Sequence, residues 1–340
     1  MLYIIIAFLW LSVLFYLLLG GADFGAGILE LFTSKVHKNE TRKIMYRAIG
    51  PIWEANHMWL VITVVILFTG FPKVFTTMSI YMHIPLLLML MGIIARGTAF
   101  SFRHYDAVRD EMQGVYNKIF RFSSFITPFF LGVIAGSTVS RRIDPNAVNF
   151  LDAYVYSWLN PFSFSVGLFT VAVCGFLAAV FIIGQTSDEN ERKRFIRKAK
   201  IFNIASFAVG GLVFITALLE KIPLVDWVFG NPVGITAFVL ATISVFILWG
   251  IWNTNKTNLM RILAGFQITM ILLIITWKHY PNIVLLKGGG YISLIENQVS
   301  DKTLNALGLA LIIASIFVLP ALFYLIYSFQ KIKEDALKSH

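Results

Sequence analysis

The sequence predicts an all-α integral membrane protein, on two observations. The chain of 340 residues is 58% hydrophobic and only 14% charged, whereas a soluble domain is about a quarter charged and about half apolar. Its apolar residues also stand in long blocks, of about the 20 residues that a helix needs to cross a bilayer. We therefore expect a single polytopic membrane domain over residues 1–340.

About nine blocks are long enough to span a membrane, and each is interpreted as one helix. They are predicted at Tyr3–Gly21, Pro51–Gly70, Ile80–Phe102, Phe122–Val139, Phe162–Gly184, Ile201–Leu219, Val233–Trp252, Ile262–Trp277 and Leu304–Phe329. Helices one and two, and helices five and six, each flank a long basic connection, which indicates a duplicated layout. The expected architecture is two four-helix bundles, within 3–139 and 162–277, plus one additional helix over 304–329.

The distribution of basic residues predicts the orientation. Lys and Arg gather in the connections after helices one, three, five and seven and in the C-terminal tail, and they are sparse in the other connections. Lys- and Arg-rich connections remain in the cytoplasm, so Met1 is expected outside and the C-terminus in the cytoplasm. The net charge of +10 is then a signal of topology and of lipid contact, and not of a nucleic-acid partner.

Two of the basic connections have patterns of their own. Residues Lys38–Ile49 alternate basic and apolar positions at helical spacing, which predicts a helix lying on the inner membrane surface. The run Asp188–Lys200 is charged throughout and is interpreted as a solvated cytoplasmic turn.

The stretch Gly50–Leu60 places a carboxylate at the start of the second span. Pro51 suits the first turn of a helix, and Glu54 follows one turn later with His57 on the same face. An acid inside a span costs about 2.5–3.5 kcal/mol at mid-depth and less near an end. Glu54 is then either an acid at headgroup depth, favoured by the helix dipole, or a carboxylate that takes up cytoplasmic protons. In the second case His57 is the next station or a partner, and Asn56 holds a bridging water.

A second acid, Asp23, is expected at the end of the first helix. It lies in Gly20–Gly27, where four glycines in eight residues permit tight bends or a close backbone approach. The segment is not a phosphate-binding loop, because no strand precedes it and no lysine follows. Asp23 is either an interfacial acid at a helix end or a second member of a proton path.

Arg96 is the third candidate. It precedes Arg103 by seven residues, which places it about 10 Å deeper in the third helix. Its side chain either reaches back to the interface or acts as the counter-ion of Glu54 or Asp23, and Gly97 would let such a neighbour approach.

Haem binding by this chain alone is not expected. Of the six histidines, only His57 and His83 are predicted to lie within spans, and they stand near opposite faces, so they cannot share one iron. Cys174 is the only cysteine, which excludes a CxxCH haem attachment and cysteine metal clusters. No pattern indicates a metal site.

Four motifs, in this order, resemble subunit II of the cytochrome bd-type quinol oxidases. They are Gly-x-Asp-Phe-Gly-x-Gly at Gly21–Gly27, Gly-Pro-x-Trp-Glu-x-Asn-x-x-Trp-Leu at Gly50–Leu60, Arg-x-x-x-Phe-x-Phe-Arg at Arg96–Arg103 and Leu-Asn-Pro-Phe at Leu159–Phe162. The nine-helix layout is similar as well, so the resemblance covers nearly the whole chain. Trp53 and Arg103 join the candidate site as supporting or ion-pairing residues of these motifs.

The resemblance implies a partner and a reaction. Such a subunit pairs with a similar nine-helix subunit I that carries the b- and d-type haems and the quinol site, and a small single-helix subunit often joins them. The complex resides in the bacterial cytoplasmic membrane, oxidises quinol and reduces dioxygen to water with protons drawn from the cytoplasm. Some relatives hold a structural quinone in this subunit, so a bound quinone or lipid is an open expectation.

The resemblance also gives Glu54 a role. The family acid at this position, often Asp, is proposed to feed a proton path towards the oxygen-reducing haem. Many relatives have a further acid where this chain has Gly20, so Asp23 would serve alone or not at all. Our hypothesis is a haem-free subunit II that scaffolds subunit I and admits protons at Glu54. The alternatives are a proton-coupled secondary transporter, which also uses intramembrane acids, and a purely structural partner.

Overall fold

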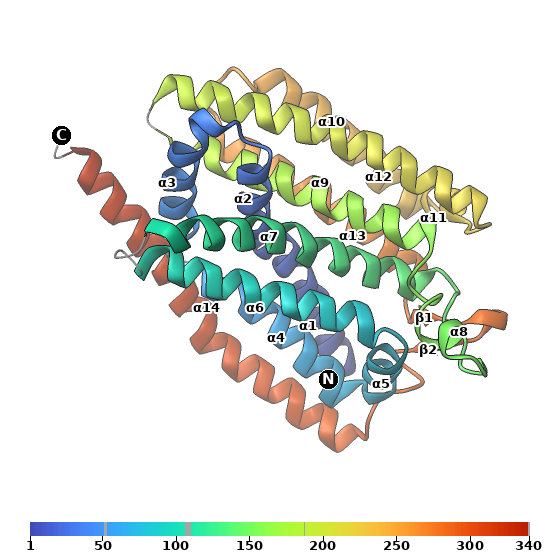
Figure 1. Cartoon of the computed structure of the whole chain (residues 1–340). Helices are drawn as coiled ribbons and strands as arrows, with labels where there is room; N and C mark the ends of the chain where they lie inside the picture. The colour runs from blue at the N-terminus through green and yellow to red at the C-terminus, as the bar shows by residue number, and fades with distance from the viewer. Residues whose placement is uncertain (51–52, 106–109, 187, 339–340) are drawn as a thin grey trace.

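The computed structural model describes residues 1–340 except 51–52, 106–109, 187 and 339–340. Long helices lying side by side form the body of the molecule (Figure 1). Within the described residues, nine helices are long and apolar enough to cross a membrane. The predicted fold class and the predicted helix number are therefore confirmed.

The first span combines three consecutive helical segments, α1 (Leu2–Phe15), a π-helical turn (Tyr16–Gly20) and α2 (Gly21–Leu31). The other spans follow in chain order. They are α4 (Trp53–Gly70), α6 (His83–Tyr105), α7 (Asp110–Val139), α9 (Pro161–Ile183), α10 (Glu189–Leu219), α12 (Pro232–Ile251), α13 (Thr257–His279) and α14 (Asp301–Lys338). The predicted start of the second span, Pro51, lies outside the described residues.

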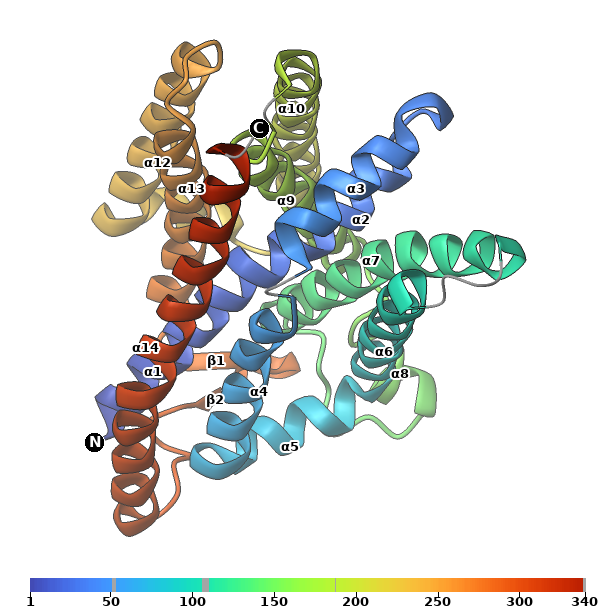
Figure 2. The same ribbon diagram turned by 90° about the vertical axis from the view of Figure 1, so that its left-hand side faces the viewer.

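The helices fall into two groups of four with one helix outside them. The first span packs with α4 and α7, and α6 packs on α7, whereas α9 packs with α10 and α13, and α12 packs on α13. The two groups meet where α2 and α7 contact α9, so the largest buried cluster surrounds α9. The remaining helix, α14, crosses α1 and α4 (Figure 2). This is the expected arrangement of two bundles and an additional helix.

The two ends of the bundle differ in structure. One end carries α3 (Lys38–Ile49) and the C-terminal end of α14 (Figures 1 and 2). The opposite end carries the N-terminus and the short elements, which are α5 (Pro72–Tyr81), α8 (Phe150–Tyr154), α11 (Leu224–Phe229) and the antiparallel strands β1 (Asn282–Leu285) and β2 (Tyr291–Ser293). The two termini thus lie at opposite ends. Which end faces the cytoplasm stays a prediction.

The predicted end of the first helix at Gly21 is wrong, because the helix continues to Leu31. The glycines serve close packing instead of a bend. A Cβ added at Gly25 would lie 1.9 Å from the carbonyl oxygen of Cys174 in α9, and one added at Gly27 would lie 2.2 Å from Ser124 Oγ in α7. Asp23 therefore stands in the interior of a helix, about 12 Å before its end.

The interpretation of Asp188–Lys200 as a solvated turn is also wrong. Asp188 accepts a hydrogen bond from the backbone N–H of Asn190 at 2.9 Å and caps α10, which begins at Glu189. Phe195 and Ala199 of this segment are both fully buried, so a charged stretch forms an amphipathic helical turn. The predicted helix at Lys38–Ile49 is confirmed as α3, whereas its place on a membrane surface stays a prediction.

Candidate functional site

A buried ion pair lies at the centre of the first bundle. Arg96 of α6 donates from Nη2 to the Asp23 Oδ1 of α2 at 2.6 Å and to the Asp23 backbone carbonyl at 3.1 Å. Its Nε donates to Ser124 Oγ of α7 at 3.2 Å. The side chains of Arg96 and Asp23 are 1% and 0% exposed. Glu54 and Asp23 were the two predicted counter-ions of Arg96, and Arg96 pairs with Asp23.

Aromatic rings enclose this pair. The Arg96 guanidinium lies 5.2 Å from the ring centre of Phe24 and 5.1 Å from that of Phe120. Aromatic ring faces attract a cation, but they carry no formal negative charge that could neutralise it. The two charges therefore depend on each other, because a buried ion is stable only with a partner.

His57 of α4 is the next ionisable neighbour. Its Nε2 lies 3.9 Å from the other carboxylate oxygen of Asp23, and its side chain is 18% exposed. The rings of Tyr16, Phe24 and Trp53 lie around the imidazole at centroid distances of 6.1, 5.7 and 6.2 Å. The predicted residues His57, Asp23 and Arg96 are thus brought together by three different spans.

Several polar atoms of this cluster are buried and have no hydrogen-bond partner within the described part of the chain. They are Tyr16 Oη, Asp23 Oδ2, His57 Nδ1, Trp59 Nε1 and Arg96 Nη1. Buried polar atoms in proteins are almost always bonded, and buried water is their usual partner where protein groups are out of reach. The cluster therefore places several unpaired polar atoms inside an apolar bundle.

Glu54 takes a different position. Its side chain is exposed on the surface of this chain, and it has no hydrogen-bond or ion-pair partner among the described residues. Trp53, its neighbour, turns inward and packs on Phe100 at a ring distance of 5.1 Å. Asn56 is buried at 5% exposure. Glu54 is one helical turn from His57, but it is not part of the Asp23 cluster.

A second acid–arginine pair lies two turns along the same helices, and the sequence reasoning missed its acid. Glu30 of α2 is 1% exposed and accepts hydrogen bonds from Arg103 Nη2 of α6 at 3.0 Å and from Arg42 Nη2 of α3 at 3.3 Å. Asp23 and Arg96 are separated by 73 positions, and so are Glu30 and Arg103. This common offset means that α2 and α6 run in the same direction.

The sequence held a signal for Glu30. It follows Asp23 by seven residues and Arg103 follows Arg96 by seven, a spacing that puts both members of each pair on one helix face. This signal was missed because the first helix was predicted to end at Gly21, and a residue beyond the end of a helix cannot be assigned to a helix face. Arg103 was expected as a supporting residue, and its side chain is 4% exposed.

Comparison with known proteins identifies the family of the chain. The sequence profile of a family described as cytochrome bd terminal oxidase subunit II matches residues 1–329. The chain belongs to this family. It is therefore a subunit of a terminal oxidase, and the nine apolar helices among its described residues fit a multi-pass membrane protein.

Three relatives illustrate the likeness. The chain is 25% identical over 333 residues to the cytochrome bd ubiquinol oxidase subunit 2 of Bacillus subtilis, covering 95% of each chain. It is 25% identical over 222 residues to the cytochrome bd-I ubiquinol oxidase subunit 2 of Escherichia coli K12, covering 62% of this chain and 57% of that one. Its fold is similar to a chain in the bd oxidase structure from Geobacillus thermodenitrificans, with a TM-score of 0.74, 20% identity and coverage of 96% and 98%.

Three histidines of this subunit II differ in their surroundings. His57 lies among the rings of Tyr16, Phe24 and Trp53, and its Nε2 approaches Asp23. His279 is buried at the end of α13, and its Nδ1 bonds the carbonyl of Ile275 at 2.8 Å. The expectation that His83 lies well within a span is wrong, since it is exposed at the first residue of α6.

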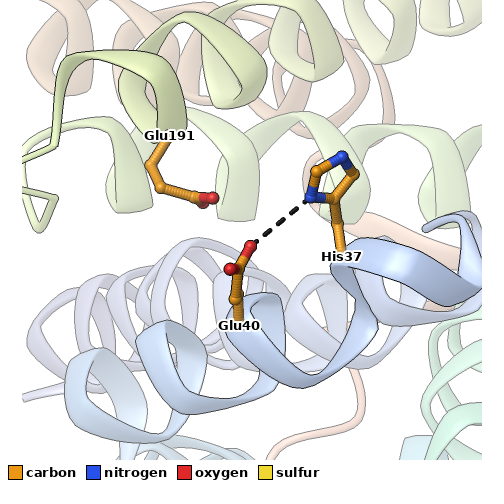
Figure 3. Close-up of side chains that lie close together, drawn as sticks. All are labelled: His37, Glu40 and Glu191. Carbon is orange, nitrogen blue, oxygen red and sulfur yellow. Dashed lines mark hydrogen bonds and ion pairs between the residues drawn. The ribbon is translucent and has the colours of Figure 1, made fainter.

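A further cluster of possible metal ligands lies at the α3 end of the subunit. Ligand atoms of His37, Glu40 and Glu191 stand within 4.8 Å of one another (Figure 3). Arg194 already pairs with both carboxylates, at 3.4 Å for Glu40. The hydrogen bonds from His37 and Arg194 lower the pKa of Glu40. The cluster is therefore best described as an ion-pair network that links α3 to α10.

Proposed function

We propose that this chain is the haem-free subunit of its oxidase, which scaffolds a haem-bearing subunit I and supplies it with cytoplasmic protons through Glu54, His57 and Asp23. The observation that carries the proposal is the approach of His57 Nε2 to the buried Asp23 carboxylate at 3.9 Å. Reduction of dioxygen to water consumes protons, so the complex needs a path for them through an apolar interior.

The three residues form a gradient of burial. Glu54 is exposed, His57 is partly buried, and Asp23 is fully buried. Imidazole gains and loses a proton near neutral pH and can pass it between two carboxylates. The unpartnered polar atoms around Asp23 support bound waters, over which protons would cross the gap of 3.9 Å. Asn56 and Trp53 would hold the start of α4, and Arg96 would keep Asp23 in place.

The partner and the ligands follow from the same proposal. The b- and d-type haems are assigned to subunit I, and the exposed Glu54 would face that subunit. The complex would lie in the bacterial cytoplasmic membrane, with a small single-helix subunit, lipid and possible structural quinone as further partners. A proton-coupled transporter is not favoured by the family match.

The test replaces Glu54 by Gln in the assembled oxidase. Losing the carboxylate should reduce oxygen consumption and proton uptake by about 10²–10⁴-fold if it relays protons, with unchanged haem spectra. Glu189→Gln is the matched control, since Glu189 is exposed on α10. Unchanged turnover in the Glu54 variant, with the complex intact, would leave only the scaffold role.

A second variant separates the relay from the scaffold. His57→Gln keeps a polar side chain of similar reach but cannot carry a proton at neutral pH. A relay predicts slow turnover with normal assembly. A scaffold alone predicts normal turnover, or loss of turnover only in step with loss of haem.

A further inference from the structure

A small cavity opens at the α3 end of the first bundle, between α2, α3, α6 and α7. Its charged lining residues are Glu30, Arg42, Arg96 and Arg103, and Phe100 and Phe120 form part of its apolar wall. The enclosed space is about 20 Å³, which is room for roughly one water-sized group. An occupant larger than water would therefore insert one atom and keep the rest at the mouth.

The charges around this cavity do not balance. Arg96 is neutralised by Asp23 at 2.6 Å. Glu30 is shared by Arg103 at 3.0 Å and Arg42 at 3.3 Å, so two cations compete for one carboxylate. One positive charge therefore remains in a site where the Arg103 side chain is only 4% exposed. An uncompensated buried charge is costly, and an anion would remove that cost.

The lining also has hydrogen-bond donors to spare. Arg42 Nε, Arg103 Nε and Arg96 Nη1 are buried and have no partner within the described residues. A planar guanidinium with free N–H groups matches the oxygen geometry of a phosphate or carboxylate. Arg42 is 27% exposed, so the cavity is accessible from its α3 side.

We propose that this cavity is a binding site for a phosphate-class oxyanion, with Arg42 and Arg103 as its donors. Basic pockets between membrane helices on the cytoplasmic side typically bind lipid headgroups. Tyr46 of α3 lines the cavity and is 40% exposed, and Phe102 beside Arg103 is 48% exposed, so an acyl chain has apolar surface to follow. The same donors would accept free phosphate. The site shares Arg96 with the proposed proton path, but its two proposed donors, Arg42 and Arg103, contact Glu30 and not Asp23.

The experiment uses the assembled oxidase in dodecyl maltoside, a detergent without phosphate, with or without added phosphatidylglycerol. Retained phosphatidylglycerol is counted by native mass spectrometry, and Tm is followed through the haem spectrum. Inorganic phosphate is titrated in the same detergent without added lipid as a separate arm. Arg42→Gln removes one donor, and Lys43→Gln is the matched control, since Lys43 is the exposed neighbour on α3.

Phosphatidylglycerol should raise the Tm of the wild type and of the Lys43 variant, and the Arg42 variant should bind it about tenfold or more weakly. Glu30→Gln should act in the opposite direction and strengthen binding, because it frees both arginines. A shift with inorganic phosphate alone identifies the free ion as the occupant. If neither anion shifts Tm, or if the Arg42 and Lys43 variants respond alike, the proposal fails.

Discussion

Arg96 and Asp23 pair at 2.6 Å although their helices, α6 and α2, meet mainly through a third helix, α7, that packs on both. Ser124 of α7 lies between them and accepts a hydrogen bond from Arg96. The ion pair thus ties together three spans of the first bundle. It also fixes the carboxylate that faces His57.

Removal of either partner of this pair should strongly destabilise the subunit. Asp23→Asn leaves the Arg96 guanidinium charged in a site that is 1% exposed, at an expected cost of about 3–5 kcal/mol. The measurement is the thermal stability of the assembled oxidase. Arg96→Gln in the Asp23→Asn background should recover part of the loss, because it removes the orphaned charge. Additive losses in the double variant would show that the two charges do not depend on each other.

Gly25→Ala should disrupt the contact between α2 and α9. The added methyl would lie 1.9 Å from the Cys174 carbonyl oxygen, so the helices must separate, at an expected cost of about 1–3 kcal/mol or more. Gly211→Ala in α10 is the control, since nothing lies within 4 Å of a Cβ there. Expression level and Tm of the complex compare the two. Equal behaviour would contradict the packing role of the glycine motif.

A pH-dependent contact is expected at the strand end of the molecule. Lys287 donates to Asp144 Oδ2 at 2.9 Å, which lowers the pKa of Asp144. A lowered pKa in the folded state means that the pair stabilises the fold above the ordinary pKa of Asp and loses this effect as the pH falls through the folded value. The pair should therefore stabilise the contact between Lys287 and Asp144 weakly at neutral pH and lose this effect in acid, while the buried side chains of the β1–β2 hairpin keep it in place.

The contact can be followed with a spin label on Tyr291→Cys, because Tyr291 is exposed at the start of β2. The native Cys174 is buried and should not take up the label. The mobility of the label should rise slightly as the pH falls below the ordinary pKa of Asp, about 3.9, because the pKa of Asp144 is lowered. In the Asp144→Asn background this change with pH should be absent. A label whose mobility follows pH equally in both backgrounds would rule out Asp144 as the titrating group.

Length, composition and apolar blocks were enough to predict the nine helices, because each span must satisfy its own backbone in lipid. The same reasoning placed Asp23, Arg96 and His57 among the candidates, because ionisable residues in spans are rare. The same reasoning predicted the ends of two helices wrongly, namely the end of α2 and the start of α10. Glycines stop helices in water, but in α2 they let α9 and α7 approach, and the charged start of α10 continues as a helix because Phe195 and Ala199 are buried.

The direction of side chains could not be predicted. Glu54 and His57 share a helix face by spacing, but Glu54 is exposed and His57 reaches Asp23, since neighbouring spans and not the helix itself decide what is covered. Glu30 was missed for a different reason, which is that the first helix was predicted to end at Gly21 although it continues to Leu31.

The π-helical turn Tyr16–Gly20 closes its hydrogen bonds over one residue more than an α-helical turn does. Each residue of a helix turns the next side chain by about 100° around the helix axis. The extra residue therefore fixes the azimuth, which is the direction around the axis in which each later side chain points. Asp23 and Glu30 reach Arg96 and Arg103 only at that azimuth. The number of residues in the first span is therefore as strict a requirement as the acids themselves, and a single deletion in this turn would swing both carboxylates away from their arginines with every charge still in the chain.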